Sequence, residues 1–479
     1  GLALDQAREE AAKAATASRR QTAVVDELGK LFEAVRPDEQ GRDVTVVQLL
    51  DGRRSTLDAE LADDPELRAT LQEFLATGYF NLGLIEPAAE LAEPALRFLE
   101  ATAGAEPLLL RRLQLILARC RLVQGRHDDA RALLERCVAE LERAGSMSSE
   151  YGVSARALEA ELHVRAGQHE LALAAYRALV ALAQEVLGPD DPQTLDAQAE
   201  LGLQLSQDQG AEEEAEQWAR RAHERALAAL GPDHPRTLSI LWRLASVLWV
   251  RGELGEALEL QRAVLEQTTK TYGEAHPNSL LAMEQLVLSL VRTRKLAEAE
   301  ELARRALELA TGAGAEDPRQ EVSARISLAR VLELSGRTEE AAQEYGDAML
   351  RLERAGLTRD PNLVVLGVRL AALELARADP ASAEMLAGDA LALGQELYPP
   401  EHATLVVARL RLGQALLAQG RLDEAEAELS ASYASAAEAV DRQAAATTGE
   451  LLRALIDLNR RQGDASEVER LQALLAPAR

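Results

Sequence analysis

The chain has 479 residues and a mass of 51.8 kDa, too large for one compact core, so several domains or a repeat array is expected. Hydrophobic residues make up 47% but aromatic residues only 3%, so alanine and leucine must fill the interior, as they do between closely packed helices. The formal net charge of −26 argues against nucleic acid and anionic lipid as partners.

Residues 1–63 are expected to form a helical N-terminal segment, and residues 64–479 carry a sequence period. Glycines that follow one apolar helical stretch and precede another mark it, namely Gly83, Gly125, Gly167, Gly210, Gly252, Gly336, Gly420 and Gly463. Neighbouring markers are 42 or 43 residues apart, except for two gaps of 84 whose midpoints are Arg294 and Ala378. Ten units are therefore predicted.

Small residues recur at fixed distances from these markers. Alanine stands five residues after the marker in nine of the ten units, and Val468 is the exception. Small side chains let two antiparallel helices approach closely, and glycine can adopt the left-handed conformation that ends the first helix. In the unit around Gly252, residues 237–251 and 254–272 both carry apolar residues at helical spacing. Each unit is therefore predicted to be a helical hairpin.

A recurring loop joins one unit to the next. GPDHPRTL at 231–238 has near-copies at 188–195 and 273–280. The glycine is expected to close the second helix, the His or Asp to cap the next helix, and the proline to occupy its first turn. The corresponding prolines are Pro65, Pro107, Pro192, Pro235, Pro277, Pro318 and Pro361.

Hairpins of this length with these loops resemble tetratricopeptide repeats, in particular the 42-residue kinesin light chain class, over residues 64–479. The resemblance implies an all-α, right-handed α-solenoid of about ten hairpins whose concave surface binds a protein or peptide. An asparagine ladder like that of kinesin light chains is largely missing, so their cargo recognition is not carried over.

Residues 17–96 are similar to the segment that joins the membrane span to the tetratricopeptide region of large bacterial serine/threonine protein kinases. The matching elements are Leu31-Phe32, Arg36-Pro37-Asp38, VTVVQLLD at 44–51 and Asp64-Pro65-Glu66-Leu67. The resemblance implies a parent with a kinase domain and one span before Gly1. With such a parent, the chain would be a soluble region outside the cytoplasm. Without one, it would be cytoplasmic. In neither case is it expected to insert into a membrane itself.

No catalytic, cofactor or metal site is predicted in the chain. The glycine-rich loop, His-Arg-Asp and Asp-Phe-Gly of a kinase do not occur, so the chain is predicted not to be an enzyme. His163, His169, His234 and His276 are interpreted as loop or surface residues. Cys120 and Cys137 lie in one unit without Cys-x-x-Cys spacing and are expected to stay reduced.

The concave face is expected to consist of first-helix positions 13, 10, 6, 3 and 2 residues before each marker. The groove residues predicted from these positions are Phe80, Asn81, Arg119, Arg165, Gln204, Gln207, Trp242, Trp249, Arg292 and Arg330. The two tryptophans share a helix face, where they either anchor a peptide side chain or pack between repeats. Arg292 and Arg330 would suit a carboxylate or an acidic peptide.

The predicted function is a protein-binding scaffold, the sensor or docking region of a bacterial serine/threonine protein kinase. The alternatives are a stand-alone adaptor and a self-assembly module that forms a homo-oligomer. The last unit, 451–479, carries charged residues on its second helix, as expected of a solvent-facing cap, so self-assembly ranks second. An enzyme, which would need a deep cleft with converging titratable groups, ranks third.

Overall fold

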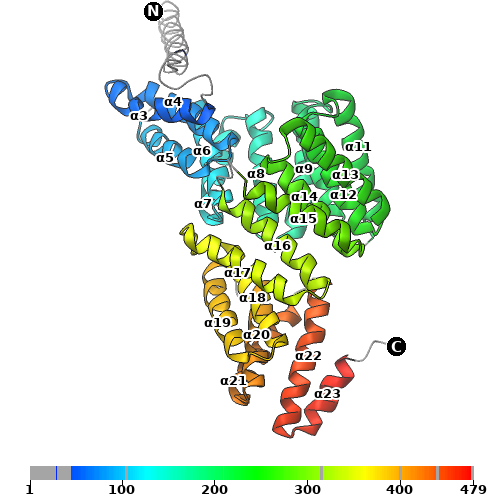
Figure 1. The fold of residues 1–479 in the computed structure, drawn as a ribbon. Coiled ribbons are helices and arrows are strands. Elements are labelled where there is room, and N and C mark those ends of the chain that lie inside the picture. The colour runs from blue at the N-terminus through cyan, green and yellow to red at the C-terminus, as the bar shows by residue number, and fades with distance from the viewer. Residues whose placement is uncertain are drawn as a thin grey trace, which may run out of the picture. The chain divides into compact units, whose positions relative to one another are not determined.

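The computed structural model describes Gly29 and residues 45–102, 106–208, 210–312, 317–398, 402–438 and 442–475. These residues form 21 helices and no strand, an all-α repeat solenoid as predicted (Figure 1). The elements expected at 31–32 and 36–38 lie outside the described residues. The chain divides into two compact units, Gly1–Glu253 and Leu254–Arg479, which we take one at a time.

Unit 1 begins with a single helix and continues as stacked antiparallel hairpins. Its helices are α3 (Val46–Glu60), α4 (Pro65–Asn81), α5 (Ile85–Ala101), α6 (Pro107–Val123), α7 (His127–Arg143), α8 (Glu150–Arg165), α9 (His169–Val186), α10 (Pro192–Leu205), α11 (Glu212–Leu230) and α12 (Pro235–Arg251). Each hairpin from α4–α5 to α10–α11 packs its two helices together, and α4, α6 and α8 also contact one another in sequence. First helices therefore form one layer and second helices the other.

Unit 2 repeats this arrangement. Its helices are α13 (Leu254–Tyr272), α14 (Pro277–Arg292), α15 (Leu296–Ala310), α16 (Pro318–Leu334), α17 (Thr338–Arg354), α18 (Pro361–Ala376), α19 (Pro380–Leu397), α20 (Ala403–Ala418), α21 (Leu422–Glu438), α22 (Arg442–Gln462) and α23 (Ala465–Leu475). The paired helices run from α14–α15 to α22–α23. On α23 only Leu471 is buried, so the expected solvent-facing character of the last helix is confirmed.

The turn inside each hairpin has the predicted left-handed backbone. All eight marker glycines have φ between 68° and 88°, and Arg294 and Ala378 have φ of 61° and 59°. Among the described residues, these two are the only non-glycine residues with positive φ. The sequence period therefore located every one of the ten turns, including the two that lack glycine.

Alanine lines the seams between helices. The nine alanines five residues after the markers are all at most 2% exposed. Gly202 brings α10 and α11 closer still, because a Cβ there would lie 2.8 Å from the carbonyl oxygen of Ala215. Close backbone approach explains how a chain with few aromatic residues fills its core.

The loops between hairpins end and begin helices as predicted. Gly231 closes α11 with φ of 87°, and His234 caps α12 by accepting a hydrogen bond from the Arg236 amide at 3.1 Å. Asp191, His276, Asp317, Asp360 and His402 cap their helices in the same way. All seven predicted prolines stand at the first position of a first helix. The motif therefore serves to start and stop helices.

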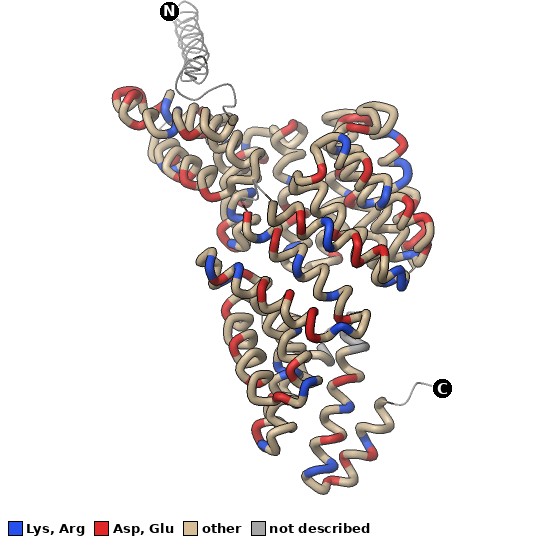
Figure 2. Tube along the Cα trace, in the orientation of Figure 1, with Lys and Arg blue, Asp and Glu red and all other residues tan. Residues whose placement is uncertain are grey.

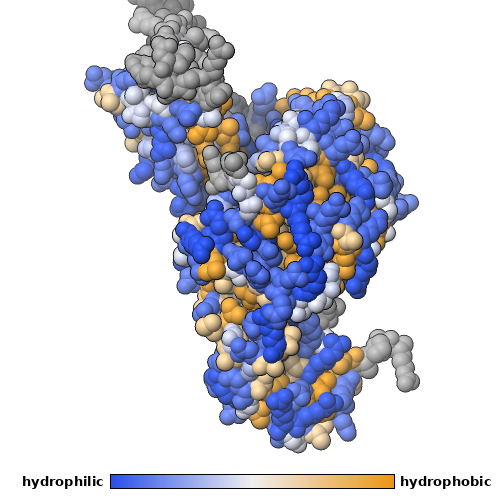
Figure 3. All heavy atoms as spheres, viewed as in Figure 1, coloured by the Kyte–Doolittle hydropathy of each residue, from blue (hydrophilic) through white to orange (hydrophobic). Residues whose placement is uncertain are grey.

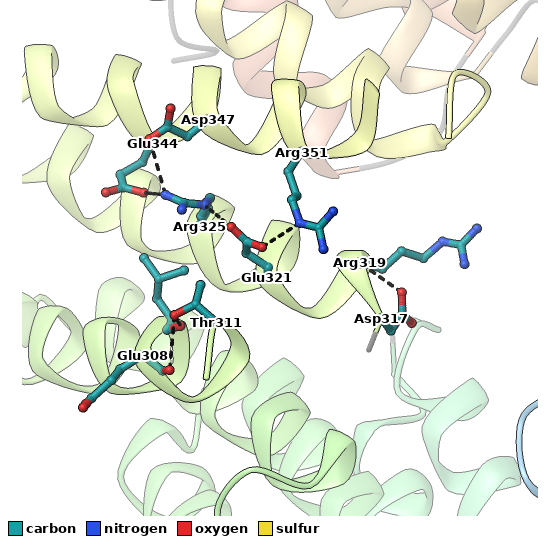
Figure 4. A network of polar contacts seen from close by, with 10 residues as sticks. Glu308, Thr311, Asp317, Arg319, Glu321, Arg325, Glu344, Asp347 and Arg351 are labelled. Carbon is teal, nitrogen blue, oxygen red and sulfur yellow. Dashed lines mark hydrogen bonds and ion pairs between the residues drawn. The ribbon is translucent and has the colours of Figure 1, made fainter. Parts of the chain in front are cut away.

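Charged residues of both signs are spread along the helices (Figure 2), and on the face drawn in Figure 3 apolar residues form small patches among hydrophilic ones. Many arginines join neighbouring helices through carboxylates. Figure 4 shows Arg325 on α16 bonded to Glu321, 3.0 Å away on the same helix, and to Glu344, 2.7 Å away on α17. Glu321 also accepts from Arg351 at 2.7 Å, so the network fastens α16 to α17.

Candidate functional site

The first helices of unit 1 line a cavity of about 630 Å³. Side chains from α6, α8, α10 and α12 form most of its wall, and Tyr176 and Leu179 of α9 complete it. Val153, Leu158 and Val164 of α8 supply apolar surface. The cavity thus lies on the layer of first helices, which is the face predicted to form the groove.

Ion pairs fix most of the charged groups around this cavity. Arg243 of α12 donates to Glu200 of α10 at 2.7 Å and lies 3.6 Å from Asp196, which also pairs with Arg236. Burial raises the pKa of the Asp196 carboxyl, and the two arginines oppose that shift. These contacts join α10 to α12 and give the wall a defined shape.

Arg119 of α6 is the exception in this wall. Within the described residues it has no hydrogen bond or ion pair, and its guanidinium lies over the Phe80 ring, 4.5 Å from the centroid. Desolvation by the surrounding protein lowers the pKa of Arg119, although the charge of Glu161 opposes this. Arg119 can therefore offer its donors to a ligand.

The structure brings some of the predicted groove residues together. Arg119 and Arg165 line the cavity, and Phe80 supports Arg119 from α4. Gln204 is 4% exposed and donates to Glu200 at 3.0 Å, so it acts on the cavity only through that carboxylate. The remaining predicted residues of unit 1 do not line the cavity: Asn81 and Gln207 are exposed, and Trp242 and Trp249 are half-buried on α12.

Three charged residues of the cavity were missed by the sequence offsets. Asp196, Arg236 and Arg243 stand 14, 16 and 9 residues before their markers. α6 lines the cavity with Arg119, near its C-terminal end, whereas most of the α10 residues that line it lie in the N-terminal half of that helix, so the groove face shifts along successive helices. The sequence did carry one sign of these arginines: Asp196 and Glu200 are one helical turn apart, so their carboxylates lie on the same helix face and favour arginine partners on a neighbouring helix.

Unit 2 has a smaller cavity, of about 540 Å³, on its own first helices α18, α20 and α22. Leu375 and Leu417 form its apolar part, and Arg453, Asp457 and Arg461 of α22 form a charged wall. Most of the lining residues stand at the predicted offsets from their markers. Further along unit 2, Arg292 is exposed on α14 and Arg330 is half-buried on α16.

Family models described as tetratricopeptide repeat match residues 194–236, 236–312 and 284–356. The chain therefore contains tetratricopeptide repeats. Repeats of this family serve as protein-binding scaffolds and are typically non-catalytic. No curated protein matches the sequence.

Several solved structures resemble the chain at low identity. A Rap protein in complex with competence and sporulation factor is 12% identical with a TM-score of 0.52, and the match covers 86% of this chain and 97% of that one. The apo quorum sensor NprR from B. thuringiensis is 14% identical with a TM-score of 0.52, covering 78% and 99%. Kinesin light chain-like repeats from Podosopora anserina are 21% identical with a TM-score of 0.31, covering 52% and 97%. These likenesses concern the fold alone.

In the part of the chain that the structure describes, no group of three or more His, Cys, Asp or Glu could hold a metal ion, and no helix is long and apolar enough to cross a bilayer. Cys120 and Cys137 are fully buried free thiols, as expected, and burial raises the pKa of each to about 11. His163 contacts Gln168, and His169 pairs with Asp208.

Proposed function

We propose that the chain is the partner-docking region of a signalling protein, and that the unit 1 cavity binds an extended peptide segment of the partner. Arg119 carries this proposal, because it is the guanidinium in the cavity wall that forms no ion pair with a carboxylate of the described residues. A peptide carbonyl or carboxylate would satisfy its donors, and the apolar surface of α8 would take a neighbouring side chain. The paired charges around it supply polar contacts of both signs.

Selection from a random peptide display library tests the peptide-binding proposal. We expect peptides that bind the wild-type chain and lose at least about tenfold in affinity when Arg119→Glu reverses the charge. Arg131→Glu is the matched control, because Arg131 lies outside the cavity wall, half-buried on the second helix α7, where it pairs with Asp128 at 3.1 Å. Failure to select any binder, or binders indifferent to Arg119→Glu, would contradict the proposed site.

We further propose that the parent is a bacterial serine/threonine protein kinase, with residues 1–63 as a juxtamembrane linker and 64–479 as one repeat domain. The similarity of residues 17–96 to the corresponding segment of such kinases supports it. Reading the gene upstream of Gly1 tests it: a kinase domain followed by one membrane span is expected. If the gene lacks a kinase domain and a membrane span, the kinase proposal is wrong and the protein is a stand-alone adaptor.

Self-assembly is the alternative role. The outer face of α23 is mostly exposed and carries charged residues such as Glu469 and Arg470, which suits a solvent-facing cap. We therefore expect a monomer in sedimentation equilibrium at micromolar concentration. A concentration-independent dimer would favour the assembly role instead.

A further inference from the structure

The unit 1 cavity has one positive charge more than it has negative charges, because four arginines but three carboxylates line it. Each carboxylate is bonded to an arginine of the same wall. Glu161 accepts from Arg165 at 3.2 Å, and Asp196 and Glu200 pair with the two arginines of α12. The remaining charge belongs to Arg119, which forms no hydrogen bond or ion pair in the part of the chain that the structure describes.

Tyr176 of α9 brings a second unused donor to this cavity. The residue is 7% exposed and lies in the wall, and its hydroxyl forms no hydrogen bond with any described residue. The other two buried tyrosines do have partners: Tyr79 donates to Asp51 at 2.6 Å and Tyr345 to Glu333 at 3.1 Å. Burial raises the pKa of Tyr176, so its hydroxyl keeps the proton that it can donate. A buried hydroxyl without a partner opposes folding, which points to an acceptor on a ligand.

Apolar side chains complete the cavity beside these donors. Val153 and Leu158 of α8 and Leu179 of α9 line it. Leu179 follows Tyr176 by three residues, so both side chains lie on one face of α9. An aliphatic side chain of a bound peptide can therefore be buried in the same cavity that holds its polar groups.

We propose that the unit 1 cavity selects a peptide in which one Asp or Glu stands next to an aliphatic residue. This inference rests on the proposed function, because it names the ligand chemistry of the same cavity. Arg119 binds the acidic side chain, and the Tyr176 hydroxyl donates to a main-chain carbonyl of the peptide. One carboxylate neutralises the single excess charge, whereas an amide leaves it uncompensated and a phosphoryl group carries up to two negative charges.

The carboxylate is assigned to a side chain inside the peptide and not to its C-terminus. The layer of first helices continues past α6, because α4 packs on α6 and Phe80 of α4 lies against the Arg119 guanidinium. A peptide can therefore run past Arg119 along this layer and does not have to end there.

Selection from two random peptide libraries tests this assignment. In one library the peptides are fused to a carrier at their C-termini, and in the other they end in a free carboxylate. We expect binders from the fused library, enriched in one Asp or Glu beside Leu, Ile or Val. Binders without an acidic residue, or binders from the free-carboxylate library alone, would overturn the assignment and leave peptide docking intact. No binder from either library would overturn both.

A thermodynamic cycle measures the contact between Arg119 and the acidic side chain, with synthetic peptides amidated at the C-terminus. Replacing the selected Asp or Glu by Gln should weaken binding to the wild type at least about tenfold, but to Arg119→Gln at most about twofold. Replacing it by phosphoserine should not strengthen binding to the wild type. Equal losses in the two proteins, or tighter binding of the phosphoserine peptide, would contradict the proposed selection.

Tyr176→Phe removes the hydroxyl alone. We expect the selected peptides to bind this variant at least about threefold more weakly, and its melting temperature to stay unchanged because the hydroxyl has no partner in the fold. Tyr151→Phe is the matched control, since Tyr151 is half-buried on α8 outside the cavity wall, and it should change neither quantity. A Tyr176→Phe variant that melts clearly earlier, or that binds as the wild type does, would overturn the role of the hydroxyl.

Discussion

Arg294 and Ala378 share a left-handed backbone, with φ of 61° and 59°, at the turn position that glycine holds in the other eight repeats. An L-residue in this conformation has its Cβ close to the neighbouring carbonyl oxygen, which disfavours it by about 1–2 kcal/mol. Both side chains are exposed, so neither gains much packing in return. The repeat architecture imposes the turn on these two residues.

Glycine at either position should therefore stabilise the protein. We expect Arg294→Gly and Ala378→Gly each to raise the free energy of unfolding by up to about 1 kcal/mol, after the greater flexibility of glycine in the unfolded chain is counted. Calorimetric melting measures it. Gly336→Ala is the reverse control and should destabilise, since Gly336 has φ of 79°. Glycine variants that melt earlier than wild type would contradict this explanation of the turn.

Gly202 tests how closely the hairpin helices approach. A Cβ at Gly202 would lie 2.8 Å from the Ala215 carbonyl oxygen and 3.1 Å from the Ala219 nitrogen, which are backbone atoms and cannot rotate away. We expect Gly202→Ala to lower the free energy of unfolding by about 1–3 kcal/mol, measured by urea titration. Gly388→Ala, on α19 with nothing within 4 Å of the added Cβ, should instead raise it by about 0.5–1 kcal/mol. Equal effects of the two substitutions would argue against the close approach.

His276 tests the capping role of the loop motif. Its Nδ1 accepts a hydrogen bond from the Asn278 amide at 3.1 Å, and its ring stacks on Tyr272 with centroids 4.7 Å apart. His276→Ala removes both contacts, whereas His276→Asp restores the acceptor and places a negative charge at the helix N-terminus. We expect the Asp variant to be more stable than the Ala variant by about 1 kcal/mol in urea titration. Two equally stable variants would mean that the cap contributes nothing.

The fold could be predicted in detail from the sequence because every repeat places the same requirements on its backbone at the same positions. A left-handed turn selects glycine, a close helix seam selects alanine, and an N-cap selects Asp or His followed by proline. Even Arg294 and Ala378 could be located, because the repeats on either side fixed their positions. Local chemistry recurring at one spacing is the information that a single sequence carries best.

The candidate sites were less predictable, because the groove face moves along successive helices. Fixed offsets found Arg119 and Arg165 but missed Arg236 and Arg243, which reach the same cavity from the N-terminal half of α12. They also predicted an accessible Gln204, which the structure places at 4% exposure. The accessibility of a side chain depends on how neighbouring repeats are rotated relative to each other and on which ion pairs and hydrogen bonds form between them. Offsets counted within a single repeat do not contain that information.

Glu284 on α14 couples the stability of unit 2 to pH. Burial raises the pKa of its carboxyl from an ordinary value of 4.5 to about 7. The folded state therefore keeps a proton that the unfolded chain releases above about pH 4.5, so the folded state loses stability as the pH rises through that interval. Above about pH 7 the half-buried carboxylate of Glu284 is charged and this loss is complete.

Removing the ionisable group should remove that dependence. We expect Glu284→Gln and wild type to have similar stability near pH 4, and the variant to be more stable near pH 8 by at most about 3 kcal/mol. Urea titration at several pH values measures the difference, and Glu266→Gln, which changes an exposed carboxylate on α13, is the control. A constant difference between Glu284→Gln and wild type from pH 4 to 8 would mean that Glu284 ionises as it does in the unfolded chain, because only a pKa that differs between the two states makes stability depend on pH.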